Sequence, residues 1–150
     1  MFDYVCLKNV SPDIEKAGKK VLKAFDIRER FFHLEFFKSN IDSQLYALEV
    51  NMRPPGGWMT DAINYSYDVN IYKQWANLLV NNHVDTEKSS QGKYFTAFAS
   101  RKNRKLYVHS HEEILYEYPN IKKYGPVEDV FSRAMGNYAY QYRAESLEEV

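Results

Sequence analysis

Two neighbouring segments with period-two alternation constrain the fold more than any other feature of this sequence. They are RFFHLEFF (residues 30–37) and QLYALEVN (residues 44–51), and the short polar stretch KSNIDS lies between them. Side chains that alternate in this way occupy the two faces of a β-strand. A connection this short allows only antiparallel pairing, since a parallel crossover needs a dozen or more residues. The sequence therefore predicts an antiparallel hairpin.

The register of this hairpin places two acids opposite each other. With the turn centred near Asp42, Glu35 lies across from Glu49. Asn51 shares the face of Glu49, together with Leu45 and Ala47, whereas Tyr46, Leu48 and Val50 form the other face, which we expect to be the core face. Like charges directly opposite each other are destabilising. Either one carboxyl group is protonated or a cation lies between the two acids.

Composition restricts the class of protein. The chain has 150 residues, of which 45% are hydrophobic and 27% charged, as in globular domains. The thirteen Tyr and nine Phe favour a packed sheet. Because the formal net charge is zero, there is no electrostatic argument for binding nucleic acid or an anionic membrane surface. Cys6 is the only cysteine and no signal peptide or membrane-spanning run is evident, so we expect a cytoplasmic location.

The remaining elements suggest an α+β fold: a mostly antiparallel sheet with flanking helices. We expect strands at residues 2–8, at 94–101 with 105–110 as a second hairpin, and at 136–146, and helices at 11–25, 68–80 and 112–118. Capping signals support the helices: Ser11 followed by Pro12, Asp68, and a capping box from Ser110 to Glu113. Ser146 and Glu149 repeat the capping-box pattern and predict a helix start at the end of the chain.

The organisation predicted is one α+β unit, residues 1–150, with residues of about 1–83 continuing into a small β-rich extension of about 92–150. Between them lies VDTEKSSQGK, residues 84–93, a polar surface loop.

The segment after the second strand carries polar groups that suit a metal and a phosphate. Asn51 adds an amide oxygen to the two acids, which gives the hard, all-oxygen ligand set of Mg²⁺ or Mn²⁺. Arg53 offers a planar donor fork to phosphates. Gly56 and Gly57 allow the backbone to approach an anion closely, and Thr60 adds a hydroxyl group. The alternative is an ordinary polar strand face on which Arg53 pairs with Glu49.

Other polar residues have simpler explanations than catalysis. His109 and His111 share the spacing of a zinc pair, but only two ligands are evident and a role at the helix cap is favoured. His33 shares the face of Glu35 and is expected to be a hydrogen-bonded neighbour of the site. The tyrosines of the last strand suggest sheet packing: Tyr138, Tyr140 and Tyr142. Cys6 is expected to be a small buried residue.

RFFHLEFF followed by LYALEVNMRPPGGWMTDAIN strongly resembles the metal-binding part of ATP-grasp enzymes, the carboxylate–amine ligases and their biotin carboxylase and carbamoyl phosphate synthase relatives. These enzymes carry one acidic ligand on a strand and E-x-N-x-R on the next. The resemblance implies that Glu35, Glu49 and Asn51 are metal ligands, and that Arg53 is a catalytic, phosphate-side residue. It also implies that Gly56, Gly57 and Thr60 belong to the segment facing ATP and substrate.

The same resemblance implies that residues of about 1–83 form a C-terminal ATP-grasp subdomain from a longer enzyme, because the family's adenine-gripping half does not match anything in this chain. The whole enzyme would use ATP and Mg²⁺ to activate a carboxylate substrate as an acyl phosphate and then join it to an amine or similar nucleophile. The chain alone is expected to be inactive. The alternative is a non-catalytic scaffold or interaction module. An exposed apolar flank on such a module would favour self-association into a homo-oligomer.

Overall fold

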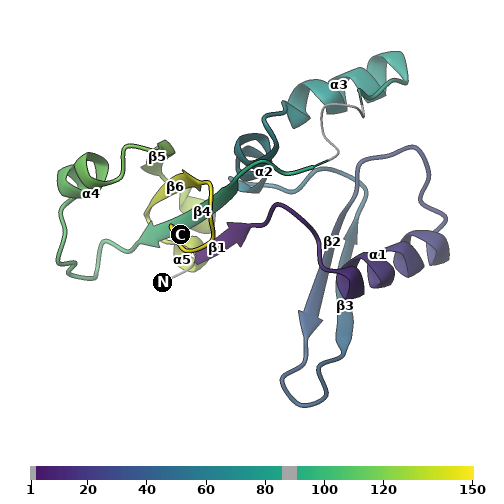
Figure 1. Ribbon diagram of the computed structural model, residues 1–150, viewed down its shortest axis with the longest axis horizontal. Coiled ribbons are helices and arrows are strands. Elements are labelled where there is room, and N and C mark those ends of the chain that lie inside the picture. Colours follow the sequence, from purple (N-terminus) through teal and green to yellow (C-terminus); the bar gives the residue numbers. More distant parts are fainter. Residues whose placement is uncertain (1–2, 86–90) are drawn as a thin grey trace. The chain divides into compact units, whose positions relative to one another are not determined.

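The computed structural model describes residues 3–85 and 91–150, so residues 86–90 of the predicted polar loop lie outside the described residues. Helices and strands follow one another as a mixed α+β chain (Figure 1). The elements are β1 (Asp3–Cys6), α1 (Pro12–Ala24), β2 (His33–Lys38), β3 (Leu45–Asn51), α2 (Met59–Tyr67), α3 (Ile71–Asn81), β4 (Phe95–Arg101), α4 (His111–Glu117), β5 (Ile121–Pro126), α5 (Asp129–Met135) and β6 (Tyr138–Ala144). All strand pairs are antiparallel, which confirms the predicted fold class.

The chain forms two compact units that are not continuous in sequence. Unit 1 contains residues 3–8, 61–69 and 91–150, and unit 2 contains residues 9–60 and 70–85. Each unit is described separately below. The assignment of about 1–83 and about 92–150 to a family subdomain and its extension stays a prediction.

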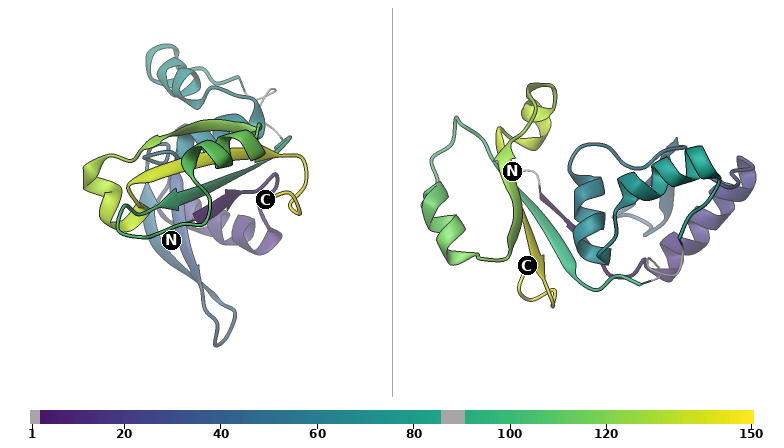
Figure 2. Two further views of the ribbon diagram at one scale, coloured as in Figure 1. Left: turned by 90° about the vertical axis from the view of Figure 1, so that its left-hand side faces the viewer. Right: turned by 90° about the horizontal axis from the view of Figure 1, so that it is seen from above.

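Unit 1 is built on a four-stranded sheet in the order β1-β4-β6-β5. One face of this sheet is the core of the unit, because Thr96, Phe98 and Ser100 of β4 are at most 2% exposed. Helix α2 contributes to this core through Ser66, whose hydroxyl donates to Thr96 Oγ1 at 2.9 Å. Helix α4 lies on the opposite face of the sheet (Figure 2).

Unit 2 contains the β2–β3 hairpin with helices α1 and α3. Helix α1 begins after Ser11 with Pro12 at its first position, as predicted, although the Ser11 side chain makes no capping hydrogen bond. A Cβ atom added to Gly18 would lie 3.6 Å from Leu34 Cδ1, so this face of α1 is close to β2. Lys38 Nζ and Asp13 Oδ2 lie 3.3 Å apart and link the same two elements.

Several predictions of secondary structure are wrong. The segment 105–110 is not a strand: β4 pairs instead with β1 and β6. Both were predicted as strands, but their pairing with β4 joins segments distant in sequence and has no local signal. Helix α3 is capped by Asn70, which accepts from Lys73 N, rather than by Asp68. Residues 146–149 form a turn and not a helix start. Three elements were not predicted: α2, β5 and α5.

The expected core face of β3 is wrong at Tyr46 and Leu48, whereas Val50 is half-buried. Tyr46 is 53% exposed and Leu48 is 56% exposed. The hairpin is a two-stranded sheet of its own, and alternation alone does not say whether another layer covers the apolar face. The capping box of α4 is confirmed, since Ser110 accepts from Glu113 N while Glu113 accepts from Ser110 N.

No helix within residues 3–85 and 91–150 is long and apolar enough to cross a membrane.

Candidate metal-binding hairpin

Glu35 and Glu49 are direct cross-strand partners in the β2–β3 hairpin. Partners in an antiparallel pair share one face of the sheet, so the two carboxylates project to the same side. Asn51 lies two residues beyond Glu49 on that face and is paired with His33. The register predicted from the sequence is therefore the register of this end of the hairpin.

A change of register follows the acid pair immediately. Glu35 is paired with Glu49, whereas Phe36 is paired with Ala47, so the ladder skips Leu48. A bulge of this kind reverses the side-chain alternation of the longer strand. As a result Tyr46, the partner of Phe37, lies on the face of Glu35 and not on the face predicted for it.

Two buried nitrogen atoms beside the acids have no partner among the residues that the structure describes. They are His33 Nδ1 and Asn51 Nδ2. The other ring nitrogen, His33 Nε2, lies 3.5 Å from Glu35 Oε1, so His33 is a neighbour of the acid pair; the hydrogen bond expected for it stays a prediction. Buried polar groups are nearly always hydrogen-bonded, so this pair of atoms favours a polar ligand at this end of the hairpin.

The loop after β3 is held by its own backbone. Thr60 is 1% exposed and its hydroxyl donates to the Pro55 carbonyl at 2.6 Å. Gly57 has a φ of 56°, in the left-handed region that glycine adopts without strain. Arg53 is exposed and donates from Nη1 to the Pro54 carbonyl at 2.9 Å. An ion pair between Arg53 and Glu49 is absent from the described part of the chain, so the alternative role suggested for this arginine is not seen.

The residues present fit a magnesium ion better than a transition metal. No group of three or more His, Cys, Asp or Glu side chains that could hold a metal occurs within the described residues. Mg²⁺ needs no such group, because it keeps several waters and takes one or two protein carboxylates together with substrate phosphate. Two facing carboxylates are such a set. Asn51 adds a side-chain amide, and rotation of that amide by 180° places its oxygen where the buried Nδ2 atom now lies.

His111 does not form a zinc pair with His109. Its Nδ1 lies 3.0 Å from the Tyr140 hydroxyl, and its Nε2 lies 3.2 Å from the Tyr138 hydroxyl. The His109 carbonyl accepts from Arg101 Nη2 at 2.9 Å. The sequence missed this histidine–tyrosine cluster because the tyrosines follow His111 by more than 25 residues, and only the strand pairing returns them to it.

Comparison with known proteins gives the class of the fold. No protein-family model matches the chain, and no curated protein matches its sequence. The fold of this chain is similar to part of two solved structures of ATP-grasp enzymes, which confirms the fold that the resemblance implied.

Two solved structures carry this likeness. Phosphoribosylglycinamide synthetase from Anaerococcus prevotii superposes with a TM-score of 0.68 over 98% of this chain and 41% of its own. L-amino acid ligase from Bacillus licheniformis superposes with a TM-score of 0.70 over 98% of this chain and 40% of its own. Sequence identity is 14% in both cases, so the likeness establishes the fold alone. This chain spans about two fifths of the length of either protein.

Proposed function

We propose that this chain supplies the magnesium-binding strands of an ATP-dependent ligase. The observation that carries the proposal is the direct pairing of Glu35 with Glu49, with Asn51 next to them on the same face. An acid pair costs stability in a strand that only has to fold, and a bound cation removes that cost. Both similar structures are named as a synthetase or a ligase, which supports the general kind of reaction.

Each residue has a separate task in this proposal. Glu35, Glu49 and Asn51 would hold Mg²⁺, or Mn²⁺ in its place. Bound there, the metal would neutralise phosphate charge on ATP. Arg53 would direct its remaining donors at the same phosphates, since within residues 3–85 and 91–150 its bond is from Nη1 to the Pro54 carbonyl. Gly56 and Gly57 would admit phosphate or substrate close to the backbone, and Thr60 would hold that loop through the Pro55 carbonyl.

The reaction proposed for the whole enzyme is activation of a carboxylate as an acyl phosphate, followed by transfer of the acyl group to an amine or similar nucleophile. Part of the proposal is that this chain alone binds ATP weakly or not at all. Calorimetry with Mg²⁺ and ATP tests that part, and micromolar affinity of the isolated chain for ATP would contradict it.

Manganese tests the metal site directly, because Mn²⁺ replaces Mg²⁺ on oxygen ligands and broadens nearby NMR signals. Substoichiometric Mn²⁺ should broaden the amide signals of Glu35, Glu49 and Asn51 first, and excess Mg²⁺ should restore them. Glu49→Gln keeps the size of the side chain and removes its charge, so it should weaken this effect by about tenfold or more.

The matched control is Glu117→Gln, at the exposed end of α4 in unit 1. It makes the same chemical change away from the hairpin and should leave the broadening unchanged. Broadening that is indifferent to Glu49→Gln, or equally sensitive to Glu117→Gln, would show that Mn²⁺ only samples surface acids, and the metal assignment would be wrong.

A non-catalytic interaction module is the second candidate function, and the hairpin also supplies its support. Apolar side chains near the hairpin turn are exposed: Phe37 63%, Ile41 99%, Tyr46 53% and Leu48 56%. Several exposed, large apolar side chains on one hairpin favour a contact with another protein surface. Sedimentation velocity across a range of concentrations separates the candidates, since self-association without any Mn²⁺ effect would favour the module.

A further inference from the structure

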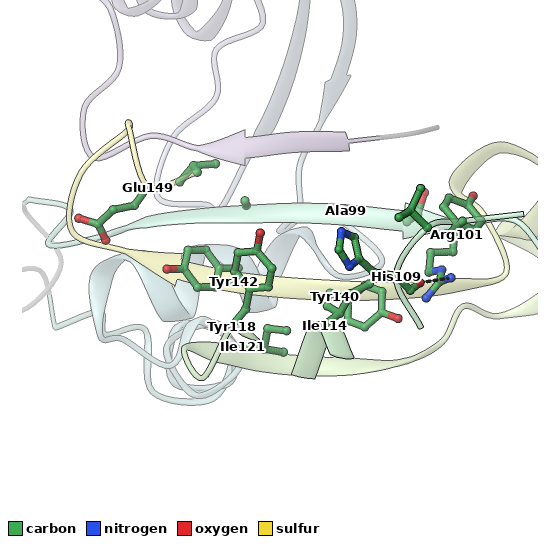
Figure 3. Close-up of a pocket in the computed structure, with 14 residues that line it drawn as sticks. Ala99, Arg101, His109, Ile114, Tyr118, Ile121, Tyr140, Tyr142 and Glu149 are labelled. Atoms are coloured by element: carbon green, nitrogen blue, oxygen red, sulfur yellow. Dashed lines mark hydrogen bonds between the residues drawn. The ribbon is translucent and has the colours of Figure 1, made fainter. Parts of the chain in front are cut away.

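The second face of the unit 1 sheet carries a cavity of about 330 Å³ (Figure 3). Its floor is formed by Ala97 and Ala99 of β4 with Tyr140 and Tyr142 of β6. It is also lined by Ile114 of α4 and by Tyr118, the residue that follows α4. Ala97 is directly opposite Tyr142 and Ala99 is directly opposite Tyr140. Two alanines beside large tyrosines leave the hollow, because no side chain on β4 fills the space between the rings.

This cavity is separate from the packed core. Phe98, between the two alanines, points to the opposite face and is 1% exposed. Ala99 itself is exposed and Tyr118 is 43% exposed, so the cavity is open to solvent. A concave, mostly apolar site of a few hundred Å³ with a small number of polar groups is the usual form of a small-molecule site.

The polar groups at one end of the cavity are cationic and fixed in place. Arg101 lies 4.4 Å over the Tyr107 ring and donates from Nη2 to the His109 carbonyl at 2.9 Å. A guanidinium group has five N–H donors, so most of those on Arg101 remain for a ligand. Since both contacts restrict the side chain, binding an anion there would cost little further ordering.

The chain around this end is basic although the protein is neutral overall. From Ser100 to His111 it has four cationic side chains and no acid: Arg101, Lys102, Arg104 and Lys105. The segment remains positive when Glu112 and Glu113, which begin α4, are included. A positive rim raises the local concentration of anionic ligands at the mouth of an apolar cavity.

Glu149 lines the cavity as well. Its carboxylate accepts from Ser146 Oγ at 3.0 Å, so it is held in the turn that follows β6. Figure 3 shows Glu149 and Arg101 at opposite ends of the row of tyrosines. A ligand therefore meets aromatic walls along its length and the guanidinium group at one end only.

We propose that this cavity binds a small organic acid with a flat aromatic body. The ring would lie over Ala97 and Ala99, against the side of Tyr140 and of the Tyr118–Tyr142 pair, whose rings contact each other edge to face, and the acid group would lie at Arg101. The site is distinct from the β2–β3 hairpin, and the proposal does not depend on the metal assignment.

Three probes separate the parts of this proposal by calorimetric titration of the full chain. 2-Naphthoate has both ring and charge, 2-naphthalenemethanol has the ring alone, and acetate has the charge alone. Naphthoate should bind with a dissociation constant below about 1 mM, at least about tenfold more tightly than either of the others. Equal binding of the acid and the alcohol, or no binding of naphthoate at millimolar concentration, would overturn the proposal.

Ala99→Leu tests the location, because it fills the floor of the cavity without removing a hydrogen bond. It should weaken naphthoate binding by about tenfold or more. Ala47→Leu, on exposed β3 of unit 2, adds the same side chain to another strand and should have no effect. Amide shifts on naphthoate addition should fall on β4, α4 and β6. Unchanged affinity in Ala99→Leu, or loss of affinity in Ala47→Leu as well, would place the probe elsewhere and overturn the proposal.

Arg101→Gln should lower naphthoate affinity to that of the alcohol and leave the alcohol's own affinity unchanged. Lys20→Gln, on the exposed surface of α1, is the matched loss of charge and should change neither. An Arg101→Gln protein that binds naphthoate as well as the parent would overturn the role given to the guanidinium group.

Discussion

Glu35 and Glu49 are direct partners across the β2–β3 hairpin, and the strand register changes immediately after them. The bulge skips Leu48, so the side-chain alternation of β3 reverses immediately after the acid pair. The acid face is thereby limited to the end of the hairpin next to Asn51 and the loop that follows. A substitution at Glu49 therefore tests the repulsion between the two carboxylates.

Glu49→Gln should stabilise the metal-free protein. Removing one of two facing negative charges relieves repulsion worth a few tenths to about 1 kcal/mol, while glutamine retains the volume of the side chain. Urea unfolding without divalent metal measures the gain, which should shrink at high salt because both groups are solvent-accessible. Glu117→Gln should give no gain. A lower stability of Glu49→Gln would show that the carboxylate has a favourable partner and is not held against Glu35.

Gly136→Ala should destabilise unit 1. Gly136 has a φ of 92°, and a Cβ atom there would lie 2.8 Å from the Arg101 carbonyl oxygen and 2.9 Å from Ser100 Cβ. Strain and overlap together should cost about 1–3 kcal/mol, read from the thermal midpoint. Gly18→Ala is the opposite case: it lies within α1, its Cβ would meet Leu34 Cδ1 at an ordinary 3.6 Å, and it should stabilise by about 0.5–1 kcal/mol. Equal effects of the two changes would contradict this explanation.

Tyr4 should make the protein less stable in alkali. Burial raises the pKa of Tyr4 to about 12 from the ordinary 10.0, although a hydrogen bond from Gln141 acts in the other direction. The unfolded chain therefore loses this proton first, and the stability that Tyr4 contributes is present below about pH 10 and lost as the pH rises toward about 12.

Tyr4→Phe keeps a ring against Phe98, which lies 4.8 Å away and nearly parallel, and removes the ionisable group. The free energy of unfolding in urea should then fall less steeply above about pH 10 than it does in the parent protein. Tyr116→Phe, at a residue that is 92% exposed, is the control and should keep the parent slope. Parallel curves for the parent and Tyr4→Phe would show that Tyr4 is not the residue responsible.

Ser110→Ala should loosen α4. The Ser110 hydroxyl accepts from Glu113 N at 3.1 Å, and loss of such a cap costs about 0.5–2 kcal/mol. Ser110→Asp should retain most of the stability, because aspartate caps equally well. Ser11→Ala should cost less, since Ser11 begins α1 without a side-chain capping bond. Hydrogen exchange of the α4 amides reports the change, and unchanged exchange in Ser110→Ala would contradict it.

The sequence by itself determined the local features of this protein. It predicted the acid pair, because the alternation and the short turn of the β2–β3 segment leave little choice of register at that end. It predicted α1 and the capping box of α4, because caps are read from neighbouring residues. The assignment of Glu35, Glu49 and Asn51 to a metal stays a prediction.

Only the tertiary structure decided which segments that are distant in sequence pair with one another. β4 pairs with β1 and β6 and not with residues 105–110, and a partner on each side leaves neither hydrogen-bonding edge of β4 unpaired. That pairing turns Ala97 and Ala99 toward the tyrosines of β6 and so creates the cavity. It also returns Tyr138 and Tyr140 to His111. Period-two alternation marks the two faces of each strand, but which face is covered depends on the layer packed against it, and no local pattern contains that information.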